Sequence, residues 1–128
     1  MSFETTIDGH KLKIDASSEN NGNNLGPRPK ALLMLSLAGC TGMDVVSLMN
    51  KMRVDYSKFN IKVEADLADE HPKKFENVKI IFEVSGKNPD SEKIEKAVKL
   101  SEERYCGVWA TLKPSVIISY EVRITNLS

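Results

Sequence analysis

The side chains with the greatest chemical potential in this sequence are the thiols of Cys40 and Cys106. They stand 66 positions apart (106 − 40), a separation that matches neither a Cys-x-x-Cys redox motif nor a pair of zinc ligands. The two histidines, His10 and His71, have no recognised metal-binding spacing to either cysteine, and we interpret them as surface strand or turn residues. We therefore expect no metal and no cofactor.

Cys40 lies in the segment Leu-Ala-Gly-Cys-Thr-Gly-Met-Asp, inside a predicted helix. A buried cysteine that acts as a small hydrophobic residue is one interpretation. Against it, Gly39 and Gly42 flank the thiol, and each glycine inside a helix costs roughly 1 kcal/mol relative to alanine. This cost indicates that a packed element or a substrate approaches the backbone closely. Thr41 and Asp44 also interrupt the apolar surface.

Activation of a thiol in the middle of a helix requires a nearby cation, because the helix N-terminus is too far away to lower its pKa. Arg28 and Lys30 are the nearest basic residues before Cys40, more than two helical turns away along the chain. Cys106 follows Arg104 and Tyr105 at a predicted helix end, where an ordinary helix-end cysteine is the alternative. Trp109 could form the wall of a pocket or simply pack.

The elements that must position these thiols follow from hydrophobic periodicity and turn signals. Alternating residues around Asp8-Gly9 predict a hairpin over 2–16, and the polar stretch 17–26 predicts a mobile loop. Pro29 suits the first position of a long helix over 29–53. Strict alternation predicts two antiparallel strands within 59–67 and 78–84, then a helix capped by Asn88, one or two helical turns over 106–112 and a closing strand over 116–124.

The first half of the long helix is apolar on nearly every side, which is typical of a helix in a core or at an oligomer interface. A sheet can cover one side only, so the far side needs a second cover. A twofold homodimer and a ligand cavity both satisfy this need, and we favour the dimer.

Composition limits the remaining possibilities. Eighteen basic and eighteen acidic residues give a net charge of zero, which provides no electrostatic reason to expect nucleic acid or a membrane surface as a partner. The longest nearly apolar run, 31–43, is shorter than the roughly 20 residues of a membrane span. The N-terminus has no apolar signal region. We expect one domain over residues 1–128 in a soluble, cytoplasmic protein.

Two segments resemble the OsmC/Ohr family (osmotically inducible protein C and organic hydroperoxide resistance), most closely its YhfA-like branch. The stretch from Arg28-Pro29-Lys30 through Ala-Gly-Cys40-Thr-Gly-Met-Asp-Val-Val resembles the first cysteine helix, and Glu-Arg-Tyr-Cys106-Gly-Val resembles the second cysteine segment. The resemblance implies an α+β fold in which antiparallel sheets wrap around long central helices in an intertwined dimer.

The resemblance also implies thiol-dependent reduction of an organic hydroperoxide or another small apolar substrate. Cys40 would attack the peroxide, Cys106 would resolve the sulfenic acid, and an external dithiol would reduce the disulfide. Lys30 stands where the peroxidase branch has a glutamate, and residues 1–27 lack the arginine that pairs with it. Arg28 and Lys30 would then supply the positive charge. A non-catalytic dimer that binds a small ligand, or a stress-related dimer with inert cysteines, remains the alternative.

Overall fold

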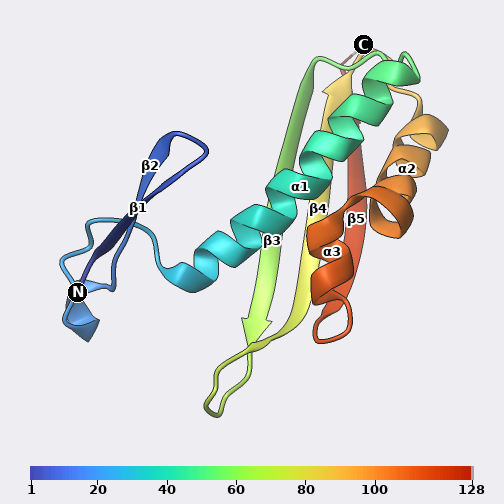
Figure 1. The fold of residues 1–128 in the computed structure, drawn as a ribbon. Coiled ribbons are helices and arrows are strands. Elements are labelled where there is room, and N and C mark those ends of the chain that lie inside the picture. Colours follow the sequence, from blue (N-terminus) through green and yellow to red (C-terminus); the bar gives the residue numbers. More distant parts are fainter. Residues whose placement is uncertain (128) are drawn as a thin grey trace. The chain divides into compact units, whose positions relative to one another are not determined.

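The computed structural model describes residues 1–127, which divide into two compact units at Ser36 (Figure 1). The first unit, Met1–Ser36, contains a hairpin, a loop and the beginning of helix α1. The second contains the rest of α1, a three-stranded sheet and the remaining helices. Each unit is described by itself below.

The predicted hairpin is confirmed. Strands β1 (Phe3–Ile7) and β2 (His10–Ile14) pair antiparallel, with Ile7 opposite His10. Asp8 and Gly9 form the two-residue turn, with φ angles of 52° and 80°. Both angles lie in the left-handed region that this turn type requires, which is why Asp-Gly predicts it correctly.

The loop after the hairpin is more ordered than the sequence suggests. It contains a short 3-10 turn, η1 (Ser18–Asn20), and is organised around the buried carboxylate of Asp15. Asp15 accepts hydrogen bonds from the backbone N–H groups of Ala16, Asn23 and Leu25 at 2.7, 3.0 and 3.1 Å. These bonds, that of Leu25 above all, lower the pKa of the Asp15 carboxyl.

Helix α1 (Pro29–Lys51) begins at the predicted proline and ends two residues earlier than predicted, before Arg53 adopts a left-handed φ of 59°. By length and composition α1 could cross a membrane, so the short apolar run counted from the sequence does not exclude a span. Core helices of soluble proteins pass the same test. In the second unit, α1 has one buried side, formed by Leu37, Thr41, Gly42, Val45 and Met49.

The sheet of the second unit has the strand order β3 (Lys58–Leu67), β4 (Phe75–Gly86) and β5 (Ile117–Asn126). The predicted antiparallel pairing holds for β3 and β4, with Ile61 opposite Phe82. Strand β5 instead runs parallel to β4. Three helical segments connect these two strands, and such a crossover returns the chain in the same direction.

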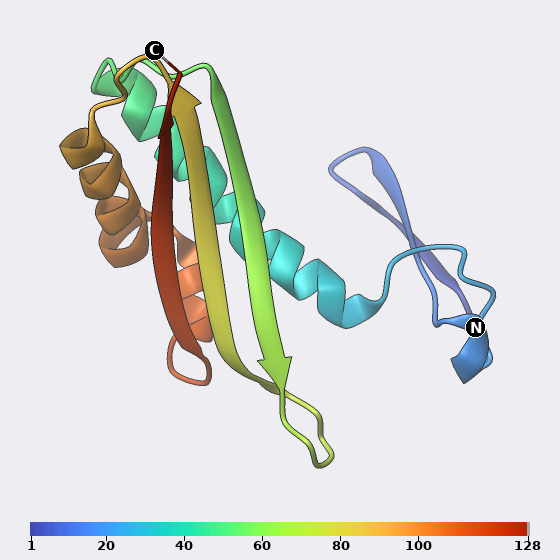
Figure 2. The ribbon, with the colours of Figure 1, turned by 180° about the vertical axis from the view of Figure 1, so that it is seen from behind.

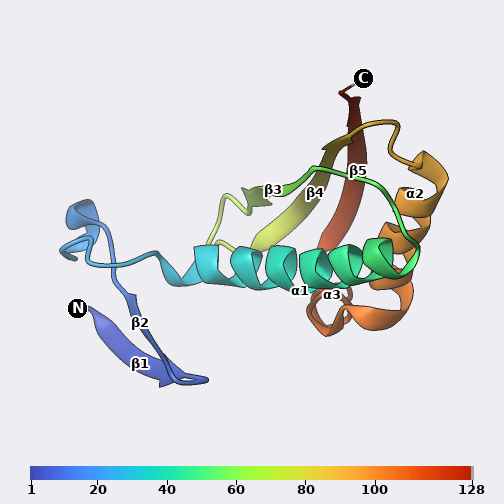
Figure 3. The same cartoon turned by 90° about the horizontal axis from the view of Figure 1, so that it is seen from above.

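Helices α1, α2 and α3 lie on one face of this sheet (Figures 1 and 3). On β4 the inward-facing residues Val78, Ile80, Phe82 and Val84 are buried. Among the described helices of this unit, none covers the opposite face (Figure 2). There Ile81 is only 1 % exposed, because it lies between Lys62 and Glu121 on the neighbouring strands, whose side chains take part in ion pairs.

Helix α2 (Ser91–Leu100) is capped by Asp90, whose side chain accepts a hydrogen bond from the Lys93 N–H at 3.2 Å. The predicted cap, Asn88, has a left-handed φ of 52° and precedes the helix. After α2 the chain forms a π-helical turn, η2 (Ser101–Tyr105), followed by α3 (Gly107–Leu112). At the end of this wide turn, Tyr105 is 56 % exposed.

Candidate functional site

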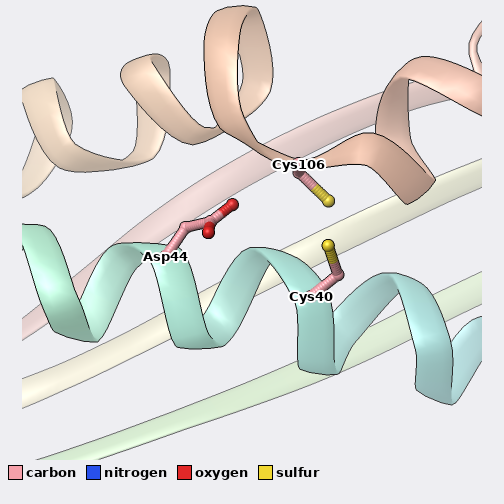
Figure 4. Close-up of side chains that lie close together, drawn as sticks. All are labelled: Cys40, Asp44 and Cys106. Atoms are coloured by element: carbon pink, nitrogen blue, oxygen red, sulfur yellow. The ribbon is translucent and has the colours of Figure 1, made fainter.

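The fold brings the two cysteines together beside one carboxylate. The Sγ atoms of Cys40 and Cys106 and a carboxylate oxygen of Asp44 all lie within 4.8 Å of one another. Cys40 and Asp44 are one turn apart on α1, so their side chains share a face of that helix. Figure 4 shows the two sulfur atoms pointing toward each other, with Asp44 alongside. Residues that no sequence motif connects therefore form a single cluster.

The π-helical turn positions Cys106. Its backbone N–H donates to the carbonyl of Ser101 at 2.9 Å, a bond that spans five residues and closes the wide turn. Cys106 then leaves the helical conformation and becomes the N-terminal cap of α3, where its sulfur accepts a hydrogen bond from the Trp109 N–H at 3.4 Å. Two backbone groups thus fix the residue and its thiol.

Asp44 is held by a chain of buried hydroxyl groups. The Ser101 hydroxyl donates to Oδ2 of Asp44 at 3.0 Å, and the Thr41 hydroxyl lies 2.8 Å from that of Ser101. Thr41 and Ser101 are both fully buried. Since the Ser101 proton goes to the carboxylate, the Thr41 hydroxyl donates to Ser101. The chain of donors ends on the carboxylate and orients it.

The two thiols differ in exposure. Cys106 is 2 % exposed, whereas Cys40 is half-buried. Burial, and next the neighbouring Cys40 thiol, raises the pKa of Cys106 to about 11, although the Trp109 N–H acts in the opposite direction. Cys106 is therefore a protonated thiol at neutral pH. Of the two cysteine residues, Cys40 is the more exposed.

The sulfurs are close without being bonded, and both cysteines are free. The S–S bond of a disulfide is about 2.05 Å long. Since the two sulfur atoms are at most 4.8 Å apart, they would have to move closer by at most about 2.8 Å to form this bond. Rotation of two cysteine side chains and a small backbone adjustment can supply a movement of this size. The arrangement can therefore support thiol–disulfide chemistry.

A depression of about 230 Å³ borders the cluster and is open to solvent. Asp44 contributes to its wall together with Ser47, Leu48, Lys51 and Tyr105. Tyr105 comes from η2 and the other four residues from α1. A small molecule or an ion can enter the region of Asp44 by this route.

The remaining sequence-predicted site residues lie in the first unit. Arg28 donates to the Gly26 carbonyl at 2.8 Å and to Oδ1 of Asn24 at 2.7 Å, while Lys30 is the second residue of α1. Their support of Cys40 stays a prediction. His10 lies on β2 and His71 between β3 and β4, and neither belongs to the cysteine cluster. The sequence analysis did not include Asp44 and Ser101 in the site. Asp44 comes four residues after Cys40, and this helical spacing could have predicted that the two side chains lie on the same face of the helix.

Comparison with known proteins identifies the family. The profile of the OsmC-like protein family matches residues 22–121, most of the chain. The chain belongs to the OsmC family. Protein YhfA of Escherichia coli strain K12 is 32 % identical to this OsmC family member over 116 residues, which cover 89 % of this chain and 84 % of YhfA.

Solved structures give the same result. A hypothetical protein from Aquifex aeolicus VF5 is 29 % identical, with a TM-score of 0.80 over 98 % of this chain and 89 % of that chain. An organic hydroperoxide resistance protein, OsmC, from Legionella pneumophila is 16 % identical, with a TM-score of 0.66 over 96 % of this chain and 95 % of that chain. The predicted resemblance and the α+β OsmC-like fold are confirmed.

Proposed function

We propose that this OsmC family protein reduces organic hydroperoxides with the thiols of Cys40 and Cys106. The observation that carries the proposal is the approach of the two sulfur atoms to within 4.8 Å, from positions that are far apart in the sequence. The family includes proteins named for organic hydroperoxide resistance, such as that of Legionella pneumophila. A more exposed thiol beside a second thiol that could resolve its sulfenic acid is typical of redox-active cysteines.

The reaction has three steps. The Cys40 thiolate attacks the terminal peroxide oxygen, the O–O bond breaks, and Cys40 becomes a sulfenic acid while the alkoxide takes a proton and leaves as alcohol. The Cys106 thiol then attacks the sulfenic sulfur, which forms the disulfide and releases water. An external dithiol returns two electrons and two protons and restores both thiols.

The difference in exposure between the two cysteines supports the proposed roles. An incoming peroxide must reach the first sulfur, and Cys40 is the more accessible of the two. The resolving thiol needs access only to Cys40. Cys106 is buried, and its sulfur lies within 4.8 Å of the Cys40 sulfur. We therefore assign Cys40 as the peroxidatic cysteine and Cys106 as the resolving one.

Activation of Cys40 differs from that in the peroxidase branch of the family. Lys30 replaces the expected glutamate, and in the described cluster the neighbouring charge is the carboxylate of Asp44. The positive charge that favours a thiolate would come from Arg28 or Lys30. We therefore expect turnover to be slower than in members that have the arginine–glutamate pair.

The proposal includes assembly as a cytoplasmic homodimer of single-domain chains. On α1, Met43 is 76 % exposed and Gly39 has no atom within 4 Å of where a Cβ would lie. This side faces away from the sheet that buries Leu37 and Val45, so a second copy could cover it. A second copy packed on this side of α1 would remove the apolar side chain of Met43 from water.

Peroxide consumption by the purified full-length protein tests the enzymatic proposal. With dithiothreitol, the wild type should consume cumene and tert-butyl hydroperoxide faster than the Cys40→Ser variant does. The Cys106→Ser variant should accumulate a dimedone-reactive sulfenic acid instead of a disulfide. Equal rates for the wild type and Cys40→Ser would end the proposal. A small molecule retained in native mass spectrometry would then favour the ligand-binding alternative.

The dimer is tested with two matched substitutions. Met43→Glu should dissociate the dimer in sedimentation or light-scattering measurements, because a charge would enter the interface. Ile117→Glu changes an equally exposed residue, 71 % accessible on β5, and should leave the dimer intact. Wild-type protein that is monomeric at micromolar concentration would contradict this part of the proposal.

A further inference from the structure

We propose that the reduced protein binds a thiophilic divalent metal ion, of which Zn²⁺ is the type case, through Cys40, Asp44 and Cys106. The observation is the convergence of two sulfurs and one carboxylate oxygen within 4.8 Å. The site goes beyond peroxide reduction, since it requires neither peroxide nor an external dithiol. It also revises the expectation from spacing that the two cysteines form no metal-ligand pair.

The donor set suits zinc. Thiolates are soft ligands that select Zn²⁺ over Mg²⁺ or Ca²⁺, and a carboxylate is an accepted third ligand. Three protein ligands leave one of four tetrahedral positions open, which water can occupy. Binding forms two metal–sulfur bonds and one metal–oxygen bond, and any proton on either thiol is released to solvent.

The distances are close to those of a bound site. Zn–S bonds of about 2.3 Å and Zn–O bonds of about 2.1 Å place tetrahedral ligand atoms roughly 3.6–3.8 Å apart. The three atoms, at most 4.8 Å apart, therefore have to close by about 1.2 Å or less. Figure 4 shows all three side chains directed into the space between α1 and the junction of η2 with α3, so rotation about side-chain bonds can supply this movement.

The supporting hydrogen bonds also match a metal site. Ligating carboxylates are commonly held by outer hydrogen-bond donors that fix their orientation. Here the buried Ser101 hydroxyl binds Oδ2 of Asp44 at 3.0 Å, and Thr41 supports Ser101. A carboxylate held by one oxygen still has the other to give to a metal. The depression beside Asp44 provides the entry path.

Metal and disulfide exclude each other, because both use the same two sulfur atoms. A bound ion would keep the Cys40 thiolate from other reactants. A two-electron acceptor, such as an organic hydroperoxide or diamide, takes two electrons from the two thiolate sulfurs as the disulfide forms; both metal–sulfur bonds break, the ion leaves as M²⁺, and the reduced acceptor takes its protons from solvent. The inference thus assigns metal binding to the reduced state alone.

Cobalt is the probe that tests the site, because thiolate-to-Co²⁺ charge transfer and strong tetrahedral d–d bands report sulfur ligation directly. Reduced full-length protein, freed of reductant under anaerobic conditions, is titrated with Co²⁺ and then with Zn²⁺. We expect one ion per chain, a charge-transfer band, and loss of the band as Zn²⁺ displaces Co²⁺. Absence of the band at millimolar Co²⁺ would overturn the proposal, as would a band unchanged in Cys40→Ser.

Matched variants establish the carboxylate as a ligand. Asp44→Asn should weaken Co²⁺ affinity by about tenfold or more, by analogy with the effect of losing supporting groups at metal sites. Asp55→Asn removes an exposed carboxylate away from the cluster and should leave the affinity unchanged. Equal affinity of Asp44→Asn and wild type would overturn the three-ligand site. Circular dichroism establishes that each variant is folded.

The oxidised protein completes the test. After treatment with diamide until no free thiol remains, the chain should no longer give the cobalt bands, and dithiothreitol followed by its removal should restore them. Retention of the bands without free thiols would contradict the assigned ligands. These measurements use no peroxide. A negative result here would contradict the metal site alone, and a negative peroxidase assay would contradict the proposed peroxide reduction alone.

Discussion

The Ser101 hydroxyl donates a hydrogen bond to Oδ2 of Asp44 at 3.0 Å, between residues 57 positions apart in the chain. The bond joins the first residue of η2 to the middle of α1; α1 carries Cys40 and Asp44, and Cys106 directly follows η2. The backbone carbonyl of Ser101 also accepts the N–H of Cys106. One residue therefore positions both the carboxylate and the second thiol.

Replacement of Ser101 by alanine should destabilise the protein by about 1–3 kcal/mol. The change leaves the buried Thr41 hydroxyl and the Asp44 carboxylate without their shared partner, and unpaired buried polar groups carry a cost of this order. Urea unfolding measures the difference. Ser47→Ala, an exposed serine on α1, is the control and should change stability by less than about 0.5 kcal/mol. Equal effects of the two changes would contradict the assigned role.

Alkylation should distinguish the two thiols. At neutral pH iodoacetamide should modify Cys40 first, because Cys106 is buried and its pKa is raised to about 11, mainly by burial. Below that pKa the thiolate fraction of Cys106 grows about tenfold per pH unit, so its modification should accelerate toward pH 11. Peptide mass spectrometry locates the label. Faster labelling of Cys106 than of Cys40 in the folded protein at pH 7 would contradict this.

Gly39 and Gly42 should respond in opposite ways to alanine. Within one chain a Cβ at Gly39 meets nothing within 4 Å, so in a monomeric background such as Met43→Glu the change Gly39→Ala should gain about 0.5–1 kcal/mol from helix propensity. A Cβ at Gly42 would lie 2.6 Å from Cδ1 of Ile61, and displacement of that side chain should cancel or exceed the gain. Urea unfolding of both variants at one protein concentration measures the difference. Loss of stability in the monomeric background would contradict this prediction, whereas loss in the dimer alone is what the proposed packing of a second chain against Gly39 predicts.

Asp15 should make the order of its loop dependent on pH. Hydrogen bonds from the N–H groups of Leu25, Asn23 and Ala16 lower its pKa below the ordinary 3.8. For a lowered carboxyl pKa, the stabilisation is present above the ordinary value and is lost as pH falls through the value in the folded state. The amide proton shifts of Leu25 and Asn23 in NMR should follow this titration, and Asp15→Asn should abolish it. A midpoint above 3.8 would contradict the assignment.

Local signals predicted much of the fold correctly. Asp8-Gly9 sets the hairpin, Pro29 starts the long helix, and strict alternation identifies the antiparallel pair β3–β4. The cost of helical glycine correctly indicated a close approach at Gly42, where β3 packs, while at Gly39 no atom of the same chain lies within 4 Å of where a Cβ would be and the expected approach stays a prediction. Helix propensity alone cannot distinguish these two positions.

The site depended on features that no local pattern encodes. The parallel direction of β5 follows from the crossover that precedes it, and alternation along a strand is the same in both directions. The contact of Ser101 with Asp44 requires the packing of α2 on α1. The cysteines were singled out from their sequence context, while their separation in space, at most 4.8 Å, comes from the tertiary fold.

The number of residues in the π-helical turn η2 determines the direction in which the following residues point, and so whether the Cys106 thiol faces Cys40. Each residue of an α-helix advances the side chain by about 100°, so removal of one residue from Ser101–Tyr105 would rotate everything after it by that angle. The buried face of α2 would remain in place, but residue 106 would turn away from α1. In evolutionary terms, a single-residue insertion or deletion is enough to create or abolish this site without altering either cysteine.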